Sequence, residues 1–187
     1  MGRNPGPTGM VHFSFHQRSE DFRWITEKMD GMRAYWNGHT LLSKYGNKIT
    51  HPTWFISEFP RDTLLDGELW LGRGKYELLI GILSSSIENA AWKRISYVVF
   101  DSPSFQGPYE RRIEQLKYLN FHEPITLIGL QQCQGNSHIR QQLEAILGVG
   151  GEGLMAHHPK SRYVEGRTTN LLKIKVWQIL FLHFKVM

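Results

Sequence analysis

Cysteine is almost absent from this sequence. Cys133 is the single cysteine among 187 residues, so neither an internal disulfide nor a zinc site made of several cysteines can form. A chain of this length buries a hydrophobic core without such cross-links. Its apolar content of 41% argues against a disordered protein. We therefore expect one globular domain whose stability comes from packing.

Long hydrophobic runs are missing as well. No stretch reaches the roughly 20 apolar residues that span a bilayer. The densest run, 176–184, is shorter and contains a glutamine and a histidine. The N-terminus has no apolar core of the kind that a signal peptide carries. We therefore expect an intracellular protein with no membrane partner, and the sequence does not distinguish the nucleus from the cytoplasm.

Most of the chain has no excess of charge of either sign. Residues 1–156 hold 16 basic and 16 acidic side chains. The whole net charge of +5 therefore lies in 157–187, where six basic residues accompany one acidic residue. A basic segment of this kind fits either a solvated surface or a polyanion such as nucleotide phosphate or nucleic acid. Composition alone does not choose between the two.

Local patterns indicate short strands mixed with a few helices. Apolar or alternating segments predict strands at 64–71, 94–101, 154–157 and 171–177. Apolar residues at helical spacing predict helices at 76–84, from Tyr109 onward and at 137–147. Strands and helices do not alternate regularly, so the predicted fold class is α+β.

Turn-forming residues add three expectations. Asn37-Gly38 lies between two strand-like segments and predicts a hairpin closed by a type I′ turn. Asn136 or Ser137 is expected to cap the helix that follows, and Gly148 is expected to end it. Residues 1–20 are rich in turn formers and are expected to be irregular.

The first segment with chemical potential is Lys-Met-Asp-Gly-Met-Arg at 28–33. Taken alone, it fits a charged turn that enters a strand. The alternative is a nucleophilic lysine, whose reactive form is the neutral amine. Neighbouring cations and partial burial favour that neutral form. A reactive Lys28 would therefore need other basic residues close to it in the fold.

Acidic and aromatic residues form the next candidates. Asp66 and Glu68 share one face of a predicted strand, where they are either solvated or part of a metal and hydroxyl site. Mg²⁺ commonly bridges one or two carboxylates to phosphates. Phe100 ends a buried strand, a position that is more often core than ligand contact. Glu152 follows two glycines and enters another strand.

Lys173 and Lys175 alternate with apolar residues near the end of the chain. In a strand both lysines project from one face, while Leu172 and Ile174 pack behind them. The pattern fits the wet face of an edge strand, and it also fits a clamp on phosphate.

The order of these segments is more informative than any one of them. Lys-x-Asp-Gly-x-Arg, Asp-Gly-Glu, an aromatic-Asp pair, Glu-Gly and Lys-x-Lys, in this order, resemble the covalent nucleotidyltransferase superfamily. It contains ATP-dependent DNA ligases, RNA ligases and mRNA capping guanylyltransferases. The linking sequence resembles the catalytic (adenylation) domain of an ATP-dependent DNA ligase, in the segments 24–36, 42–49, 65–70, 153–156 and 166–175.

The resemblance implies a fold and an activity. The fold is a nucleotidyltransferase (ATP-grasp-like) domain of antiparallel sheets flanked by helices, which we expect over 21–176. The activity is that of a DNA ligase with ATP, Mg²⁺ or Mn²⁺ and nicked double-stranded DNA as its partners. In this family a lysine takes AMP from ATP and passes it to a 5′-phosphate, and a 3′-hydroxyl then displaces AMP and seals the nick.

The resemblance also assigns nucleotide-binding roles. Lys28 would attack the α-phosphorus and become lysyl-AMP. Lys173 and Lys175 would hold the α-phosphate and complete the catalytic set. Phe100 would stack on adenine, and Glu27 would join the same nucleotide-binding set.

Four residues carry the roles in ribose, metal and DNA binding that the resemblance implies. Arg33 would contact the ribose and later the DNA end. Glu68 would hold a ribose hydroxyl, and Glu68 and Glu152 would bind the metal. Lys44 stands where the family usually has arginine, which keeps the charge for a DNA contact but loses the bidentate fork.

The ends of the chain depart from the family pattern. Family members continue past the Lys-x-Lys strand into an OB-fold domain, whereas this chain runs only 12 residues past Lys175, into the apolar segment 177–187. We therefore expect a monomer without an OB fold, impaired in nick sealing and prone to association through its tail. An RNA ligase or capping-type enzyme is one alternative, and an inactive nucleotide- or DNA-binding remnant is another.

Overall fold

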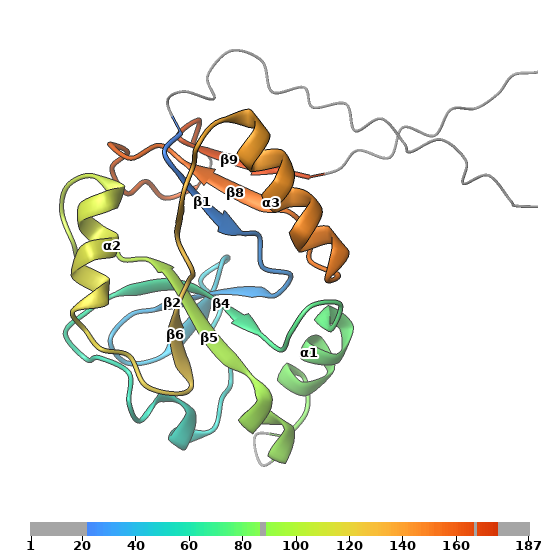
Figure 1. Ribbon diagram of the computed structural model, residues 1–187. Helices are drawn as coiled ribbons and strands as arrows, with labels where there is room; N and C mark the ends of the chain where they lie inside the picture. Colours follow the sequence, from blue (N-terminus) through green and yellow to red (C-terminus); the bar gives the residue numbers. More distant parts are fainter. Residues whose placement is uncertain (1–21, 87–88, 167, 176–187) are drawn as a thin grey trace, which may run out of the picture.

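The computed structural model describes residues 22–86, 89–166 and 168–175. Figure 1 shows two β-sheets with helices packed around them. The segments 1–20 and 177–187, and both end residues of the expected domain 21–176, lie outside the described ranges. Within these ranges, no helix is long and apolar enough to cross a membrane.

The two sheets differ in size. The first has the strand order β7-β1-β8-β9 and is antiparallel throughout. Its strands are β1 (Trp24–Glu27), β7 (Gln131–Gln132), β8 (Leu154–His157) and β9 (Leu171–Ile174). The second has the order β3-β2-β4-β5-β6 and is antiparallel except for the parallel pair β5 and β6. Its strands are β2 (Met32–Trp36), β3 (Leu41–Ser43), β4 (Leu65–Trp70), β5 (Ser96–Asp101) and β6 (Ile125–Leu127).

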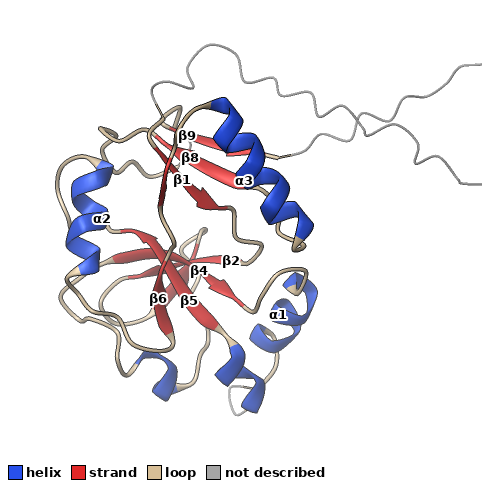
Figure 2. Ribbon diagram, in the orientation of Figure 1, coloured by secondary structure: helices blue, strands red, loops and turns tan. Residues whose placement is uncertain are grey.

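The helices lie on the outside of the sheets, as Figure 2 shows. The α-helices are α1 (Tyr76–Leu83), α2 (Tyr109–Lys117) and α3 (Asn136–Gly148), and two short 3-10 helices, η2 (Thr53–Ile56) and η3 (Ala90–Arg94), precede β4 and β5. Antiparallel sheets flanked by helices confirm the predicted α+β class.

Helix α3 covers one face of the first sheet, and α2 contacts the other face near Trp24 and His157. Ile139 and Leu143 of α3 pack on Ile25 of β1 and Ile174 of β9. Because successive side chains of a strand point to opposite faces, Lys173 lies on the face away from α3. The predicted arrangement of β9, with its lysines exposed and its apolar residues packed behind them, is confirmed.

The second sheet carries a larger, aromatic core. Trp36, Phe55 and Phe59 are buried there, and the Phe59 and Tyr97 rings stack with centroids 5.2 Å apart. The Tyr97 hydroxyl donates a hydrogen bond to the carbonyl of Leu65 at 3.1 Å, which places the Tyr97 ring across the strand pair.

Two motif glycines are needed for close approach of the strands. A Cβ on Gly67 would lie 2.8 Å from the Tyr97 ring, and a Cβ on Gly31 would lie 2.3 Å from the carbonyl oxygen of Leu69. The glycines of Asp-Gly-Glu and Lys-x-Asp-Gly-x-Arg therefore allow β2, β4 and β5 to approach each other closely.

The predicted hairpin exists, but its turn was predicted wrongly. Trp36 pairs with Leu41, so four residues rather than two connect β2 to β3. The Asn37 side chain accepts hydrogen bonds from the backbone N–H groups of His39 and Thr40 at 3.0 and 2.8 Å. This side-chain turn replaces the backbone type I′ turn, because asparagine can bond to the chain two or three residues on.

The predicted N-cap of α3 also needs correction, whereas the predicted helix end at Gly148 is confirmed. Gly135, with φ of 103°, is the N-cap, and neither Asn136 nor Ser137 caps the helix. Gly148 is the last helical residue, and Gly150 with φ of 79° follows the helix end. The helices α1 and α2 and the strands β4 and β8 lie where periodicity predicted them. Of the strand predicted at 171–177, β9 covers the first four residues, and 176–177 lie outside the described ranges.

A buried ion pair joins α2 to the second sheet. Arg112 donates to both oxygens of Asp101 at 2.7 and 2.8 Å and to the carbonyls of Gly107 and Ser161 at 2.8 Å each. The Arg112 side chain is only 2% exposed. Burial raises the pKa of Asp101, although the guanidinium acts against that rise. The pair fixes α2, β5 and the loop after β8 to one another.

Removing Arg112 should strongly destabilise the fold. Arg112→Ala leaves the Asp101 carboxylate buried without a counter-charge, which typically costs about 3–5 kcal/mol. Arg111→Ala is the matched control, because Arg111 is exposed on the same helix and should change the free energy of unfolding by about 0.5 kcal/mol or less. Urea denaturation measures both. Equal losses in the two variants would contradict this role of Arg112.

Candidate active site

Lys28 directly follows β1, and the register of the first sheet determines its neighbours. Glu27 pairs with Leu154 in an antiparallel ladder, so the next residue, Lys28, lies beside Gly153. The backbone N–H of Lys28 donates to the carbonyl of Gly153 at 2.9 Å. The antiparallel ladder therefore brings the Lys-x-Asp-Gly-x-Arg segment next to the Glu-Gly segment, which is more than 120 residues away in the sequence.

A single carboxylate binds two predicted catalytic lysines. Glu152 accepts a hydrogen bond from Lys28 on one oxygen and from Lys175 on the other. The Lys28 side chain is 17% exposed, so its amine is largely enclosed. Burial would raise the pKa of Glu152, but the hydrogen bonds from Lys175 and Lys28 outweigh it and leave that pKa below its usual value. The sequence requirement for a second basic residue beside Lys28 is thus met by Lys175.

The second sheet places an acid and a base opposite each other. Arg33 of β2 pairs with Glu68 of β4, so the two side chains share one face. Burial raises the pKa of Glu68 to about 7, although the positive charges of Lys28 and Arg33 act in the opposite direction. Glu68 therefore lies within the electrostatic reach of the lysine that the first sheet presents.

Arg33 is oriented by a buried partner. It donates to Asp66 through Nε at 3.0 Å and through Nη2 at 2.5 Å. The Tyr163 hydroxyl donates to the same carboxylate at 2.9 Å. Asp66 was expected to lie beside Glu68 as a solvated or metal-binding group. The structure instead uses Asp66 to hold Arg33.

A bulge in β5 presents Phe100. Gly67 pairs with Val99 and Asp66 pairs with Asp101, so Phe100 is the extra residue of β5 between these pairs. A bulge of this kind redirects the side chain it carries. The Arg33 guanidinium carbon lies 5.6 Å from the centre of the Phe100 ring. Phe100 is half-buried beside the site, rather than fully buried in the core.

Three predicted residues lie farther from this cluster. The acidic group of Glu27 accepts two hydrogen bonds of 2.7 Å from Arg73, on the loop before α1. Lys44 lies in the exposed turn after β3, with its amine 4.8 Å from the centre of the Tyr45 ring. Among the described residues, Lys173 joins none of the recorded ion pairs and lies exposed beside Met155. The roles of these three remain predictions.

Sequence reasoning missed the residues that support the site. Tyr163 and Arg73 lie in loops, and their partners Asp66 and Glu27 are 97 and 46 residues away in the sequence. No local pattern marks such contacts. Asp66 itself was expected on the same face of β4 as Glu68, because it lies two residues before it.

The carboxylates of the site suit a divalent cation that is shared with phosphate. Over the described ranges, no group of three or more His, Cys, Asp or Glu residues is placed to hold a metal. Two carboxylates remain near Lys28: Glu152, which already binds two cationic groups, and Glu68, whose buried acid would be stabilised by a cation. Mg²⁺ is often held by one or two carboxylates together with phosphates and water. Glu152 and Glu68 suit such a site in their chemistry, and their role as metal ligands stays a prediction.

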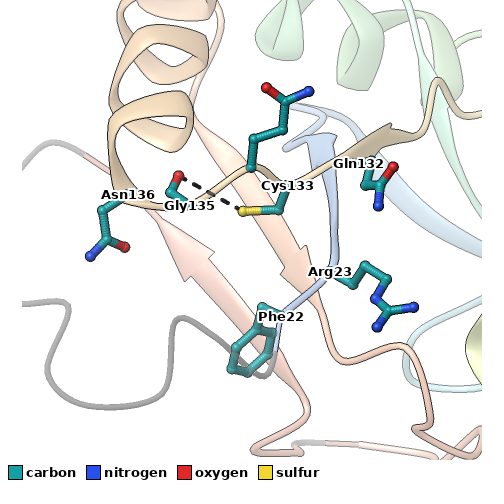
Figure 3. Close-up of a pocket in the computed structure, with 7 residues that line it drawn as sticks. Phe22, Arg23, Gln132, Cys133, Gly135 and Asn136 are labelled. Carbon is teal, nitrogen blue, oxygen red and sulfur yellow. Dashed lines mark hydrogen bonds between the residues drawn. The ribbon is translucent and has the colours of Figure 1, made fainter.

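A separate hollow lies at the other end of β1. Figure 3 shows this hollow, of about 620 Å³, which is lined by residues that include Arg23, Cys133 and Asn136. None of the predicted site residues lines it. Lys28 follows the opposite end of β1, so the hollow is distinct from the lysine cluster.

The comparisons with known proteins agree with the geometry. The family described as "ATP dependent DNA ligase domain" matches residues 10–175. The DNA ligase of Haemophilus influenzae is 32% identical over 156 residues, which cover 81% of this chain and 58% of the relative. DNA ligase 4 of Candida glabrata is 27% identical over 206 residues, which cover 88% of this chain and 22% of the relative. The chain thus spans little more than half of the first relative and under a quarter of the second.

Solved structures share the fold. A Lig E DNA ligase, described as binding DNA with a minimal scaffold, aligns with a TM-score of 0.80 and 29% identity over 92% of this chain and 69% of its own. The Chlorella virus DNA ligase-adenylate aligns with a TM-score of 0.70 and 23% identity, over 85% of this chain and 64% of its own, and shows likeness of fold alone. With the family match over most of its length and the motif residues assembled around Lys28, this chain belongs to the ATP-dependent DNA ligase domain family.

Proposed function

We propose that this chain is the adenylation part of an ATP-dependent DNA ligase, in which Lys28 carries AMP from ATP to the 5′-phosphate of nicked DNA. One observation carries the proposal. The enclosed amine of Lys28 donates to the Glu152 carboxylate, which also accepts from Lys175. The positive charges of Lys28 and Arg33 act on the carboxyl group of Glu68, which pairs with Arg33 across the ladder. A nucleophile, a second amine and two carboxylates are thereby gathered at one point.

The first step forms the lysyl-AMP bond. The neutral amine of Lys28 attacks the α-phosphorus of ATP, the phosphorus–nitrogen bond forms, and the bond to the β-phosphate breaks to release pyrophosphate. The amine proton leaves to solvent or to the phosphates. Such transfers depend on alignment and charge neutralisation. Lys173 of β9 and Lys175 directly after it are exposed, and they would supply positive charge for the α-phosphate.

The remaining groups of the site would bind the nucleoside. The half-buried ring of Phe100 beside Arg33 offers a surface on which adenine can stack. Glu68 lies on the same face of the sheet as Arg33, and it would accept a hydrogen bond from a ribose hydroxyl. Mg²⁺, bound by Glu152 and Glu68, would neutralise phosphate charge. The role of Glu27 would be indirect, since its carboxylate is engaged by Arg73.

DNA would approach over β3 and β2, the first two strands of the second sheet. Arg33 lies in β2, and Lys44 lies in the exposed turn that directly follows β3. Both cations would therefore contribute to DNA binding on this part of the sheet. A 5′-phosphate oxygen held there would attack the phosphorus of lysyl-AMP. The phosphorus–nitrogen bond would break, and the Lys28 amine would be regenerated. The 3′-hydroxyl would then attack the activated 5′-phosphate and displace AMP.

Labelling with ATP tests the nucleophile. The parent protein, incubated with α-labelled ATP and Mg²⁺, should gain one acid-labile label, and both Lys28→Ala and Lys28→Arg should gain none. Arginine keeps the charge but cannot act as the neutral amine. Lys117→Ala, at an exposed lysine in the last turn of α2, is the control and should label like the parent.

Two results of the labelling would overturn the proposal. Labelling from GTP and not from ATP would assign the chain to a capping-type enzyme. Undiminished labelling of Lys28→Ala would place the nucleophile elsewhere.

Glu68→Gln should separate function from stability. Between pH 4.5 and about 7 the folded chain binds more protons at Glu68 than the unfolded chain, so rising pH lowers the stability of the parent over this interval. The glutamine variant should therefore gain stability relative to the parent as pH rises to about 7. Its lysyl-AMP formation should fall about tenfold, because a charge-assisted hydrogen bond becomes a neutral one.

Urea denaturation across this pH range and the labelling rate measure the two effects. Glu114→Gln, at an exposed glutamate of α2, is the control and should change neither. A Glu68→Gln variant that loses stability as pH rises, in parallel with the parent, would show that the raised pKa is not that of Glu68.

Lys44 should contribute to DNA binding through its charge. Lys44→Ala should weaken binding to nicked duplex DNA and reduce the dependence of log Kd on log salt by about one ion. Lys44→Arg should tighten binding, because the guanidinium fork can hold a phosphate bidentately. Fluorescence anisotropy over a salt series measures both, with Lys93→Ala at an exposed lysine before β5 as the control. Identical salt dependence in Lys44→Ala and Lys93→Ala would remove Lys44 from the DNA contact.

A further inference from the structure

Two acidic residues are paired across β4 and β5. Asp66 of β4 pairs with Asp101 of β5 across the ladder, and each carboxylate is bound by an arginine through two hydrogen bonds. The two ion pairs differ in exposure. The Arg112 side chain is 2% exposed, whereas the Arg33 side chain is 43% exposed.

The buried pair of Arg112 and Asp101 is held by several hydrogen bonds. Arg112 donates to the carbonyls of Gly107 and Ser161 in addition to Asp101, so its position is determined from three directions. The exposed pair has fewer constraints. Arg33 is held by Asp66 and lies against the Phe100 ring, with the rest of its guanidinium open to the site.

Tyr163 connects the two pairs. Its hydroxyl donates to Oδ2 of Asp66 at 2.9 Å, and that oxygen also accepts from Arg33. Its ring centre lies 6.0 Å from the guanidinium carbon of Arg112, which in turn holds the nearby carbonyl of Ser161. One side chain therefore contacts both the buried pair and the pair that faces the site.

We propose that Tyr163 is a positioning residue, whose hydroxyl fixes the Asp66 carboxylate and thereby the direction of the Arg33 guanidinium. The Asp66 side chain is 2% exposed, so water cannot replace a lost partner. Without the hydroxyl, the carboxylate can rotate about its bond to Cβ, and the bidentate geometry with Arg33 is no longer unique. The consequence for catalysis rests on the proposed function, in which Arg33 contacts the ribose and the DNA end.

Tyr163→Phe is the sharpest test, because it removes only the hydroxyl and keeps the ring beside Arg112. The first readout needs no activity: side-chain NMR of the ligand-free chain should show the Nε–H of Arg33 exchanging with water about tenfold faster in the variant. Tyr118→Phe is the matched control, since Tyr118 is exposed, and should leave that exchange unchanged. An unchanged Arg33 exchange rate in Tyr163→Phe would overturn the proposal.

The second readout uses the reaction. Tyr163→Phe should raise the KM for ATP in lysyl-AMP formation or slow AMP transfer to nicked DNA by about tenfold. The urea midpoint should fall as well, because the buried Asp66 carboxylate loses a donor, so both steps are measured without urea, where the chain stays folded. On an Arg33→Lys background the same substitution should have no further effect, because lysine cannot form the fork that the hydroxyl orients. An equal loss on both backgrounds would show a structural role and overturn the proposal.

The two readouts separate the two ideas. A parent chain that forms no lysyl-AMP would contradict the proposed function, and the exchange of Arg33 would still decide whether Tyr163 positions it. A parent that forms lysyl-AMP, together with a Tyr163→Phe variant that matches it in exchange and in both steps, would leave the proposed function standing and remove Tyr163 from it.

Discussion

The interaction on which the site depends is the Glu152 carboxylate shared by two lysines. Lys28 follows β1, Glu152 precedes β8 and Lys175 follows β9, so one side chain joins the ends of three strands of the first sheet. Charge and topology support each other here. The antiparallel ladder brings the three segments together, and the opposite charges make their approach favourable.

The second sheet contributes the complementary half of the site through its own ion pairs. Arg33 and Glu68 share a face because β2 and β4 are paired in that register, and the close approach of these strands needs glycine at position 31. Glu68 is kept in surroundings that raise its pKa to about 7. Selection for stability alone would favour an apolar or neutral side chain at this position. A buried carboxyl group with a raised pKa is therefore typical of a functional constraint.

Sequence patterns were sufficient for the elements with strong periodicity and for the core of the site. The apolar spacing of α2 and the alternation of β9 predicted those elements, and the ordered motifs predicted that Lys28, Glu152 and Lys175 belong to one site. The turn after β2 could not be predicted from the sequence. The Asn37 side chain accepts hydrogen bonds from two backbone N–H groups, and this replaces the backbone geometry of a type I′ turn. Tyr163 was also beyond reach, because only the folded chain shows that a loop residue contacts Asp66.

The hydrogen bond from the Lys28 backbone to Gly153 makes the position of the nucleophile a property of strand register. Side chains alternate between the faces of a strand, so a shift of one residue in β1 would turn every side chain of that strand over. Lys28 would then point toward α3 instead of toward Arg33 and Glu68. Substitutions in this short strand can be absorbed by repacking, but a single inserted or deleted residue cannot. The position of Lys28 therefore depends more on the number of residues in β1 than on which residues they are.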